Sequence, residues 1–510
     1  MTSTIKVDPD FKVAPVNRRS FGSFVEHLGR CVYSGIYEPG HPTANDAGFR
    51  QDVLDLVREL GVTTIRYPGG NFVSGYRWED GVGPVDQRPR RLDLAWHSTE
   101  PNTFGVDEFL AWTKAAGVEP MMAVNLGTRG VQEALDLLEY CNIAGGTMLS
   151  DRRRANGAQA PYGVKMWCLG NEMDGPWQIG GMNAHEYGRL VSRTAKAMRM
   201  IDPTLELVAC GSSHSSMPTF GQWEREVLTQ AYDDVDFVSA HAYYCEADGD
   251  MASFLAESCN MDYFIDSVIA TVDHVMAAEK RTKKINISFD EWNVWYQQRA
   301  ESRPPSGDDW PVAPVLLEDK YNVADAVVVG SLLISLLRHS DRVRSACLAQ
   351  LVNVIAPIMT QPGGPSWKQT TFHPFALTAR YAKGDVLNLA VRCDTVPTAK
   401  FGDVPAIDAV ATRDAETGDL ALFVVNRRTT PALGATPPKE GNEDVVVDLS
   451  SIGECRVAEA VVLTNPDLMW QATMADSTSV APRPLAADVR DGQLHFSLPP
   501  VSWAMIRVVA

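Results

Sequence analysis

Residues 49–67 read FRQDVLDLVRELGVTTIRY, and this stretch contains the unit from which the fold can be inferred. Its first part has apolar side chains at three- and four-residue spacing, which is typical of one face of a helix. These side chains are Phe49, Val53, Leu56, Val57 and Leu60. Gly61 follows as a helix stop, and residues 63–67 form a short β-rich run. The stretch therefore predicts a helix that leads into a strand.

The same alternation continues along most of the chain. Eight strand-like runs occur, at residues 21–26, 63–67, 120–125, 164–169, 205–210, 235–241, 284–290 and 346–353. Several of the segments between them show helical periodicity, including 131–141 and 187–201, and Gly117 closes another helix. Eight βα repeats predict an α/β fold, a (β/α)8 TIM barrel over residues 19–383. The alternative is a doubly wound open sheet, which would often carry a glycine-rich phosphate turn after its first strand, and no such turn is present.

The helical pattern stops near Gly384, and strand-like runs separated by turn signals follow. The predicted strands are residues 387–391, 407–412, 420–425, 444–449, 456–463, 494–498 and 503–509, and residues 431–441 are rich in turn formers. We expect a C-terminal β-sandwich, jelly-roll-like, over residues 384–510. Residues 1–18 also look extended and are expected to add a strand to this sandwich.

Composition narrows the class of partner and the compartment. The net charge is −18, which argues against nucleic acid or an anionic membrane and is compatible with a neutral substrate. The most apolar run, residues 323–337, contains Asp325 and is expected to be a buried helix rather than a membrane span. The nine cysteines are scattered singly, and residues 1–12 lack an apolar leader core. We therefore expect a cytoplasmic protein with reduced thiols.

Two glutamates stand where barrel enzymes place their chemistry, just past the ends of strands. The fourth strand continues as WCLGNE (167–172) and the seventh as ISFDEW (287–292). A lone glutamate there is better explained as a surface acid, but two carboxylates at one rim are what glycoside hydrolysis requires. Asp290 competes with Glu291, because strand alternation would point them to opposite sides and spacing does not say which points inward.

Other strand ends carry side chains that suit a polyhydroxyl ligand. Arg66 could pair with a carboxylate or form a structural ion pair, and Tyr243 could orient a carboxylate or form an aromatic wall. A ring of carboxyl, amide and hydroxyl groups suits sugar hydroxyls, each of which both donates and accepts. Trp96, Trp177, Trp292 and Trp295 are candidates for stacking on a sugar, with core packing at least as good an explanation for each.

Four motifs resemble the family-51 glycoside hydrolases, the α-L-arabinofuranosidases. They are FVEH (24–27), RYPGGN (66–71), GNEMDGPWQ (170–178) and DEWNVW (290–295). The resemblance implies that Glu172 is the general acid/base and Glu291 the nucleophile, which favours Glu291 over Asp290. It also implies that Arg66 supports the nucleophile. The implied substrate-binding residues are Glu26, Asn71, Trp96, Asn171, Trp177, Tyr243, Trp295 and Gln350.

The resemblance further implies an exo-acting, retaining enzyme. It would release terminal arabinofuranose from arabino-oligosaccharides or arabinoxylo-oligosaccharides by double displacement, with no metal and no organic cofactor. A homo-oligomer, often a hexamer, is usual in that family. The α-1,2, α-1,3 or α-1,5 linkage preference stays open.

Three other functions would share some of these sequence features. Another retaining hydrolase of the same clan, such as an endoglucanase or β-xylosidase, would keep both glutamates. A metal-dependent sugar isomerase would need several ligands at strand ends, where His27 and His241 are the only histidines expected. A non-catalytic sugar-binding protein would keep the aromatic residues without needing two glutamates.

Overall fold

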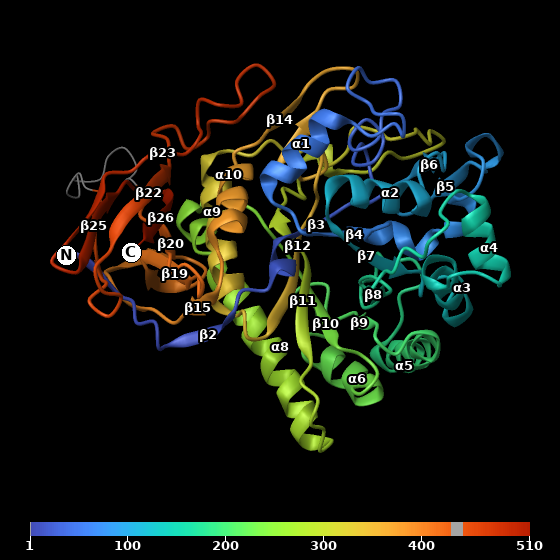
Figure 1. Cartoon of the computed structure of the whole chain (residues 1–510), viewed down its shortest axis with the longest axis horizontal. Helices are drawn as coiled ribbons and strands as arrows, with labels where there is room; N and C mark the ends of the chain where they lie inside the picture. Colours follow the sequence, from blue (N-terminus) through green and yellow to red (C-terminus); the bar gives the residue numbers. More distant parts are fainter. Residues whose placement is uncertain (1, 430–441, 510) are drawn as a thin grey trace.

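The computed structural model describes residues 2–429 and 442–509, so the turn-rich stretch predicted at 431–441 lies outside the described residues. The fold has two parts that lie side by side along the long axis of the molecule (Figure 1). Within the described ranges, no helix is long and apolar enough to cross a membrane.

The first part is a closed barrel of eight parallel strands, which confirms the predicted fold class. The strands are β3 (Gly22–Phe24), β4 (Thr64–Tyr67), β7 (Glu119–Val124), β8 (Met166–Leu169), β9 (Glu206–Ala209), β10 (Phe237–Tyr244), β11 (Asn286–Val294) and β12 (Val343–Leu348). They follow one another around the barrel in chain order, and β12 pairs with β3 to close it. Every one of the eight predicted runs contains or overlaps a barrel strand, because strands buried on both faces form continuous apolar runs.

Helices surround the barrel. They are α1 (Gln51–Leu60), α2 (Val106–Ala116), α3 (Val131–Asn142), α4 (Met148–Ala155), α5 (Ala184–Ile201), α6 (Gln222–Ala231), α7 (Met251–Leu255), α8 (Ser258–Ala278), α9 (Val323–Arg338) and α10 (Phe372–Tyr381). Gly61 and Gly117 end α1 and α2 with φ of 78° and 76°, a left-handed conformation that glycine adopts without strain. Both predicted helix stops are therefore confirmed.

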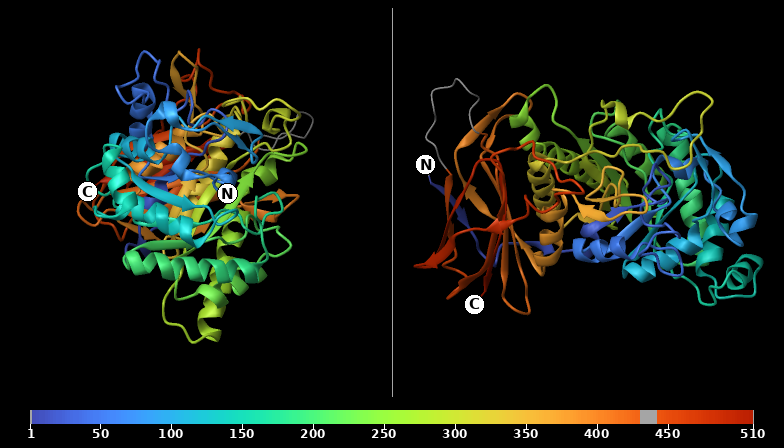
Figure 2. Two further views of the ribbon diagram at one scale, coloured as in Figure 1. Left: turned by 90° about the vertical axis from the view of Figure 1, so that its right-hand side faces the viewer. Right: turned by 90° about the horizontal axis from the view of Figure 1, so that it is seen from above.

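The second part contains two antiparallel-rich sheets that pack face to face. One has the order β16-β1-β21-β25-β24 and the other β2-β15-β19-β20-β26-β22-β23. Their strands are β1 (Ser3–Lys6), β2 (Lys12–Pro15), β15 (Asp385–Leu387), β16 (Ala390–Arg392), β19 (Ile407–Arg413), β20 (Leu420–Asn426), β21 (Glu443–Asp448), β22 (Arg456–Leu463), β23 (Arg483–Pro484), β24 (Ala487–Arg490), β25 (Gln493–Leu498) and β26 (Ser502–Val509). A separate apolar core lies between the sheets, and Figure 2 shows this sandwich at one end of the molecule.

The N-terminal segment is part of this sandwich. β1 pairs with β21 in parallel and with β16 in antiparallel, while β2 pairs with β15 in the other sheet. The chain thus begins in the sandwich, enters the barrel at β3 and returns to the sandwich after α10.

Three hairpins of the described residues were not among the predicted strands. Two of them are β5 (Arg91–Asp93) with β6 (Ser98–Glu100) and β13 (Ile358–Thr360) with β14 (Ser366–Lys368). In the third, β17 (Thr395–Thr398) and β18 (Gly402–Pro405) form a separate two-stranded sheet, and β17 packs against α7 of the barrel. Its strands are short, carry two prolines and have mostly exposed or half-buried side chains, so they lack the apolar run that marks the other strands.

Helix α9 lies between barrel and sandwich, and every residue of 323–337 is buried. This confirms the expectation of a buried helix at that position. Gly330 faces the sandwich, where a Cβ atom would lie 2.2 Å from Cδ1 of Trp503. Only glycine therefore allows this close approach of helix and sheet.

A buried ionic cluster joins the two parts. Asp408 of β19 forms ion pairs with Arg427, which follows β20, and with Arg338 at the end of α9. Ser258 of α8 and Ser331 of α9 each donate a hydrogen bond to Asp408 at 3.3 Å. The Asp408 side chain is 7% exposed and that of Arg427 is 4% exposed, so each charge depends on its partners for compensation.

Replacing Asp408 by alanine is expected to destabilise the protein by about 3–5 kcal/mol, because Arg427 is left buried without its carboxylate. Denaturant unfolding followed by tryptophan fluorescence measures this. Asp385→Ala is the matched control: its partner Lys12 is 57% exposed, and loss of such a surface pair costs about 0–1 kcal/mol. Equal losses in the two variants would contradict the assignment.

Candidate active site

A cavity of about 1170 Å³ opens at the carboxyl ends of the barrel strands. The predicted residues that line it are Glu26, Asn71, Trp96, Glu172, Trp177, Tyr243, Glu291, Trp295 and Gln350. Arg66 and Asn171 lie directly behind this lining, where Arg66 donates hydrogen bonds to Glu291 of the lining and to Asn171. The structure therefore brings all eleven predicted residues together, while Trp292, also weighed as a stacking residue, is fully buried in the core.

Glu291 is held by two groups on β4 and β10. Nη1 of Arg66 lies 2.6 Å from its Oε1, and the Tyr243 hydroxyl donates to its Oε2 at 2.7 Å. Burial works to lower the pKa of Arg66, but the charges of Asp290 and Glu291 raise it well above the ordinary value. Arg66 is thus a permanent positive charge in the barrel centre, paired directly with Glu291.

Asp290 and Glu291 both point into the barrel, so the expectation from strand alternation was wrong. Ser239 of β10 pairs with Ser288 of β11, and His241 pairs with Glu291. One residue therefore separates the two paired positions on β10, and two residues separate them on β11. This β-bulge inserts an extra residue and re-aims the side chains that follow. Asp290 lies below the cavity floor and Glu291 on its surface.

His241 links the carboxylates, a role that sequence reasoning missed. Its Nδ1 lies 2.8 Å from Oε1 of Glu172 and its Nε2 lies 2.9 Å from Oδ1 of Asp290. Burial opposes a charged ring, but Glu291 nearby and the hydrogen bonds to Asp290 and Glu172 raise the pKa of His241 well above its usual value. The available signal was its position two residues before Tyr243 on one strand, which puts both on the inner face.

Glu172 differs from Glu291 in its surroundings. Trp177 donates its Nε1–H to Oε2 of Glu172 at 2.6 Å, and no arginine among the described residues forms a hydrogen bond or an ion pair with this carboxyl group. Burial, followed by the charge of Glu291, raises the pKa of Glu172, while His241 and Trp177 oppose that shift. Glu172 also has a φ of 43°, a strained conformation of the kind that clusters at active sites.

The two glutamates are close together. One carboxylate oxygen of each, together with one ring nitrogen of His241, lies within 4.8 Å of the others. Retaining glycosidases hold their two carboxyl groups about 5–5.5 Å apart, and inverting ones about 6.5–9.5 Å.

Glu26 lies at the opposite wall among neutral donors. Its Oε1 accepts from the Phe72 amide and Trp96 Nε1, both at 2.9 Å, and its Oε2 accepts from Gln350 Nε2 at 3.0 Å. Burial raises the pKa of Glu26 to about 8. A Cβ on Gly69 would come within 2.7 Å of Glu26 Cγ, so the RYPGGN turn needs a glycine there to pass beneath this side chain.

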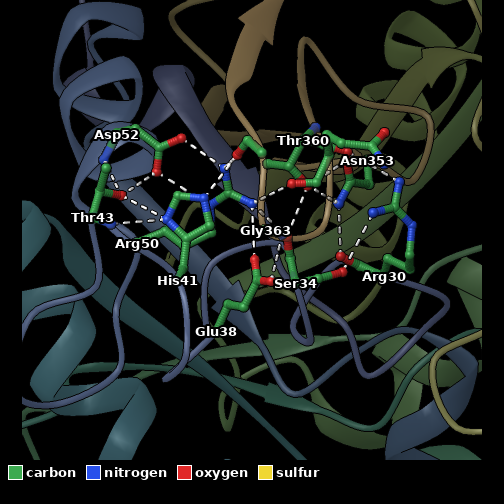
Figure 3. Close-up of polar contacts among 12 residues, drawn as sticks. Arg30, Ser34, Glu38, His41, Thr43, Arg50, Asp52, Asn353, Thr360 and Gly363 are labelled. Carbon is green, nitrogen blue, oxygen red and sulfur yellow. Dashed lines mark hydrogen bonds and ion pairs between the residues drawn. The ribbon is translucent and has the colours of Figure 1, made fainter.

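The loops that follow Glu26 and Gln350 are tied to each other (Figure 3). Arg50, whose side chain is fully buried, bonds Glu38 at 3.0 Å, Asp52 at 2.7 Å and the Gly364 carbonyl at 2.7 Å. Gly364 belongs to the hairpin of β13 (Ile358–Thr360) and β14 (Ser366–Lys368). This network ties together two loops that are about 300 residues apart in the chain.

The closest approach to a metal-ligand set among the described residues is Glu172, His241 and Glu291. Both ring nitrogens of His241 are already bonded to carboxylates, and Arg66 supplies a positive charge to Glu291. The donor set therefore suits proton transfer better than cation binding.

Comparison with known proteins matches nearly the whole chain. A model of the α-L-arabinofuranosidase 1 domain matches residues 56–261, and one of the α-L-arabinofuranosidase C-terminal domain matches residues 290–502. A Streptomyces lividans protein named intracellular exo-α-(1→5)-L-arabinofuranosidase is 57% identical, covering 99% of this chain and 75% of its own. A Bifidobacterium longum protein named exo-α-(1→6)-L-arabinofuranosidase is 56% identical, covering 99% of this chain and 97% of its own.

Solved structures agree with these matches. The structure of a family 51 α-L-arabinofuranosidase from Bifidobacterium longum superposes with a TM-score of 0.93 at 50% identity and 99% coverage of both chains. That of a Thermotoga maritima α-L-arabinofuranosidase in complex with arabinose gives 0.86 at 34% identity, with full coverage of both chains.

The ion pairs of Asp290 predict a pH-dependent contribution to stability. Burial opposes its charge, but Arg66 and His241 lower its pKa below the ordinary value. A lowered native pKa stabilises the fold above the unfolded-state pKa and loses that effect as pH falls through the native one. Asp290→Asn should therefore lower stability by about 3–5 kcal/mol from pH 7 down to about pH 4, and by less as the pH falls further, below the unfolded-state pKa of about 3.9.

Thermal unfolding of both proteins from pH 7 to about pH 2.5, on both sides of the unfolded-state pKa of about 3.9, measures this difference. Asp308→Asn, at an exposed loop position, is the control and should match the parent throughout. A difference between Asp290→Asn and parent that is constant with pH would contradict the role of the charge.

Proposed function

Because this chain belongs to the family 51 α-L-arabinofuranosidases and is thus a glycoside hydrolase, we propose that it releases terminal arabinofuranose from short oligosaccharides with retention of configuration. The substrates would be arabino-oligosaccharides or arabinoxylo-oligosaccharides. Relatives are named for (1→5) and for (1→6) linkages, so α-1,5 is one candidate linkage and α-1,6 another.

The spacing of Glu172 and Glu291 carries the proposal. One oxygen of Glu172 lies within 4.8 Å of one oxygen of Glu291, and this close approach supports a retaining arrangement, in which the second carboxylate attacks the sugar and forms a covalent intermediate. In the first step, an oxygen of Glu291 would attack the anomeric carbon while the Glu172 proton passes to the departing glycosidic oxygen. In the second, Glu172 takes a proton from water, and the resulting hydroxyl group displaces Glu291 and restores the configuration.

The surroundings of each glutamate support this division of roles. Arg66 and Tyr243 bond to both oxygens of Glu291 and hold the carboxyl group in a fixed orientation, as a nucleophile requires. Burial raises the pKa of Glu172, as a general acid requires at neutral pH. The mechanism needs no metal and no organic cofactor, because two carboxyl groups suffice for both steps.

The remaining lining residues would bind the terminal sugar. Glu26, Asn71, Asn171 and Gln350 offer acceptors and donors for its hydroxyls, and Oε1 of Gln350 is buried without a partner among the described residues. Trp96, Trp177 and Trp295 would form the walls. A pocket of this kind binds one terminal residue and suits exo action.

The proposal also covers the cellular location, the oligomeric state and the domain boundaries. Relatives from Streptomyces lividans, Halalkalibacterium halodurans and Bacillus subtilis are named intracellular, which supports a cytoplasmic location and small, imported substrates. We propose a homo-oligomer, with a hexamer as the expected form. We also propose functional boundaries at 1–18, 19–383 and 384–510, with no nucleic acid or membrane partner.

The roles of the two glutamates can be separated with azide. Glu172→Ala should lower the turnover of natural substrates by about 10²–10⁴-fold or more, because their leaving alcohols must be protonated by an acid. An aryl α-L-arabinofuranoside should still form the glycosyl-enzyme, and azide should restore turnover and give the α-azide. Glu291→Ala should lose all natural turnover, and any azide rescue should give the inverted β-azide.

Product configuration by NMR reads out the result, with Asp308→Ala as an unaffected control. The β-azide from Glu172→Ala together with the α-azide from Glu291→Ala would mean that the roles are reversed. No hydrolysis of the aryl arabinofuranoside by the parent protein would overturn the proposed function itself.

The pH profile gives a further test of Glu172. An acid must be protonated to act, so kcat/KM should fall as pH rises through the pKa of Glu172. Trp177→Phe removes a donor that stabilises the charged form, which raises that pKa further. The alkaline limb of the Trp177→Phe profile should therefore move to higher pH. A limb that moves to lower pH would show that another group sets it.

A further inference from the structure

The cavity is larger than one terminal sugar requires. Pockets that enclose a whole drug-sized ligand measure about 300–1,000 Å³, and this one measures about 1170 Å³. Glu26, Trp96 and Gln350 account for one end of it. The other end is formed by the segment after β10, by α7 and the start of α8, and by the turn of the β17–β18 hairpin.

A continuous wall leads from Glu172 toward that far end. Trp177, which donates to Glu172, stacks on the His214 ring with centroids 6.1 Å apart and planes inclined by 13°. The neighbour of His214, Ser215, accepts a hydrogen bond from Asn260 of α8 at 3.4 Å. This wall therefore begins at the group proposed to protonate the departing oxygen, and beyond Trp177 it faces the leaving chain.

The hairpin from the sandwich ends the wall. The Lys400 amide donates to Ser253 Oγ of α7 at 3.0 Å, and Nζ of Lys400 contacts both oxygens of Glu257 at 2.7 and 2.9 Å. The side chain of Glu257 is 6% exposed, whereas that of Lys400 is 51% exposed. An ammonium group has three N–H donors, so one remains after the two bonds to Glu257.

We infer that Lys400 and Asn260 form a binding subsite for the leaving chain, beyond its first sugar, and that this chain is a neutral oligosaccharide. The inference rests on the proposed function and adds the sandwich hairpin to the substrate site. Lys400 and the amide of Asn260 supply donors to sugar hydroxyls. Asp248, Asp250 and Glu257 outnumber Lys400 at this end, so a chain carrying uronic acids is disfavoured by charge.

Contacts made far from the reacting carbon can accelerate the reaction by holding the substrate in place. The parent enzyme should therefore have a higher kcat/KM for α-1,5-arabinotriose than for arabinobiose. Lys400→Met keeps the aliphatic stem and removes the ammonium group. It should lower the triose-to-biose ratio of kcat/KM by about tenfold, mainly through KM, because one charged hydrogen bond is lost.

Lys400→Arg should keep most of the ratio, because guanidinium also pairs with Glu257 and retains free donors. Asn260→Ala should lower the ratio without touching the hairpin, which separates a lost subsite from a displaced hairpin. Lys114→Met, on the exposed face of α2, is the control and should leave the ratio unchanged. Isothermal titration of arabinotriose into Glu291→Ala, with and without Lys400→Met, should show the same loss of affinity as a rise in Kd.

A parent enzyme that does not distinguish triose from biose would overturn the inference, as would equal losses on both sugars in Lys400→Met and Asn260→Ala. Either result would leave the proposed function intact, provided that the aryl arabinofuranoside is hydrolysed. Failure on the aryl substrate would instead remove the function on which the inference rests.

Discussion

The ion pair between Arg66 and Glu291 is the interaction around which the barrel centre is organised. Arg66 is 1% exposed, and its guanidinium reaches Glu291, Asn171 and, at 3.8 Å, Asp290. A charge buried this deeply is tolerated only when it is matched. Arg66 and His241 each contact both Asp290 and Glu291, so these basic and acidic side chains lie directly against one another. Glu172 contacts His241 and Trp177 instead, at the edge of this cluster.

Local structure explains how two similar side chains acquire different chemistry. Glu291 has a guanidinium and a hydroxyl, whereas Glu172 has an indole and an imidazole and lies in a strained turn. The β-bulge in β11 is what makes the first environment possible, because it allows Asp290 to contact His241 from below while Glu291 meets the cavity. A regular strand would place only one of these acids inside the barrel.

Much of the fold could be predicted from local patterns, because parallel strands leave apolar runs and helix stops leave glycines. The barrel runs, α9 and the strand-end glutamates all carry such signals. The bulge does not, since it depends on how β10 and β11 are paired and not on either sequence alone. His241 was visible at a strand end, but its two carboxylate partners come from other strands. The β17–β18 hairpin was missed because it packs against α7, about 140 residues earlier, and because its own strands are short, contain two prolines and are mostly exposed or half-buried.

The position of Lys400 also bears on how such a protein can change over generations. A barrel that formed its whole cavity by itself could be joined to a different C-terminal domain without any change in the shape of that cavity. Here a buried acid of the barrel, Glu257, has its counter-charge on the sandwich, and the same lysine lines the cavity. Exchange of the C-terminal part by recombination would therefore alter both the barrel's charge compensation and the shape of its cavity. Variation in a domain that holds no reacting group thus becomes a route by which substrate range can diverge.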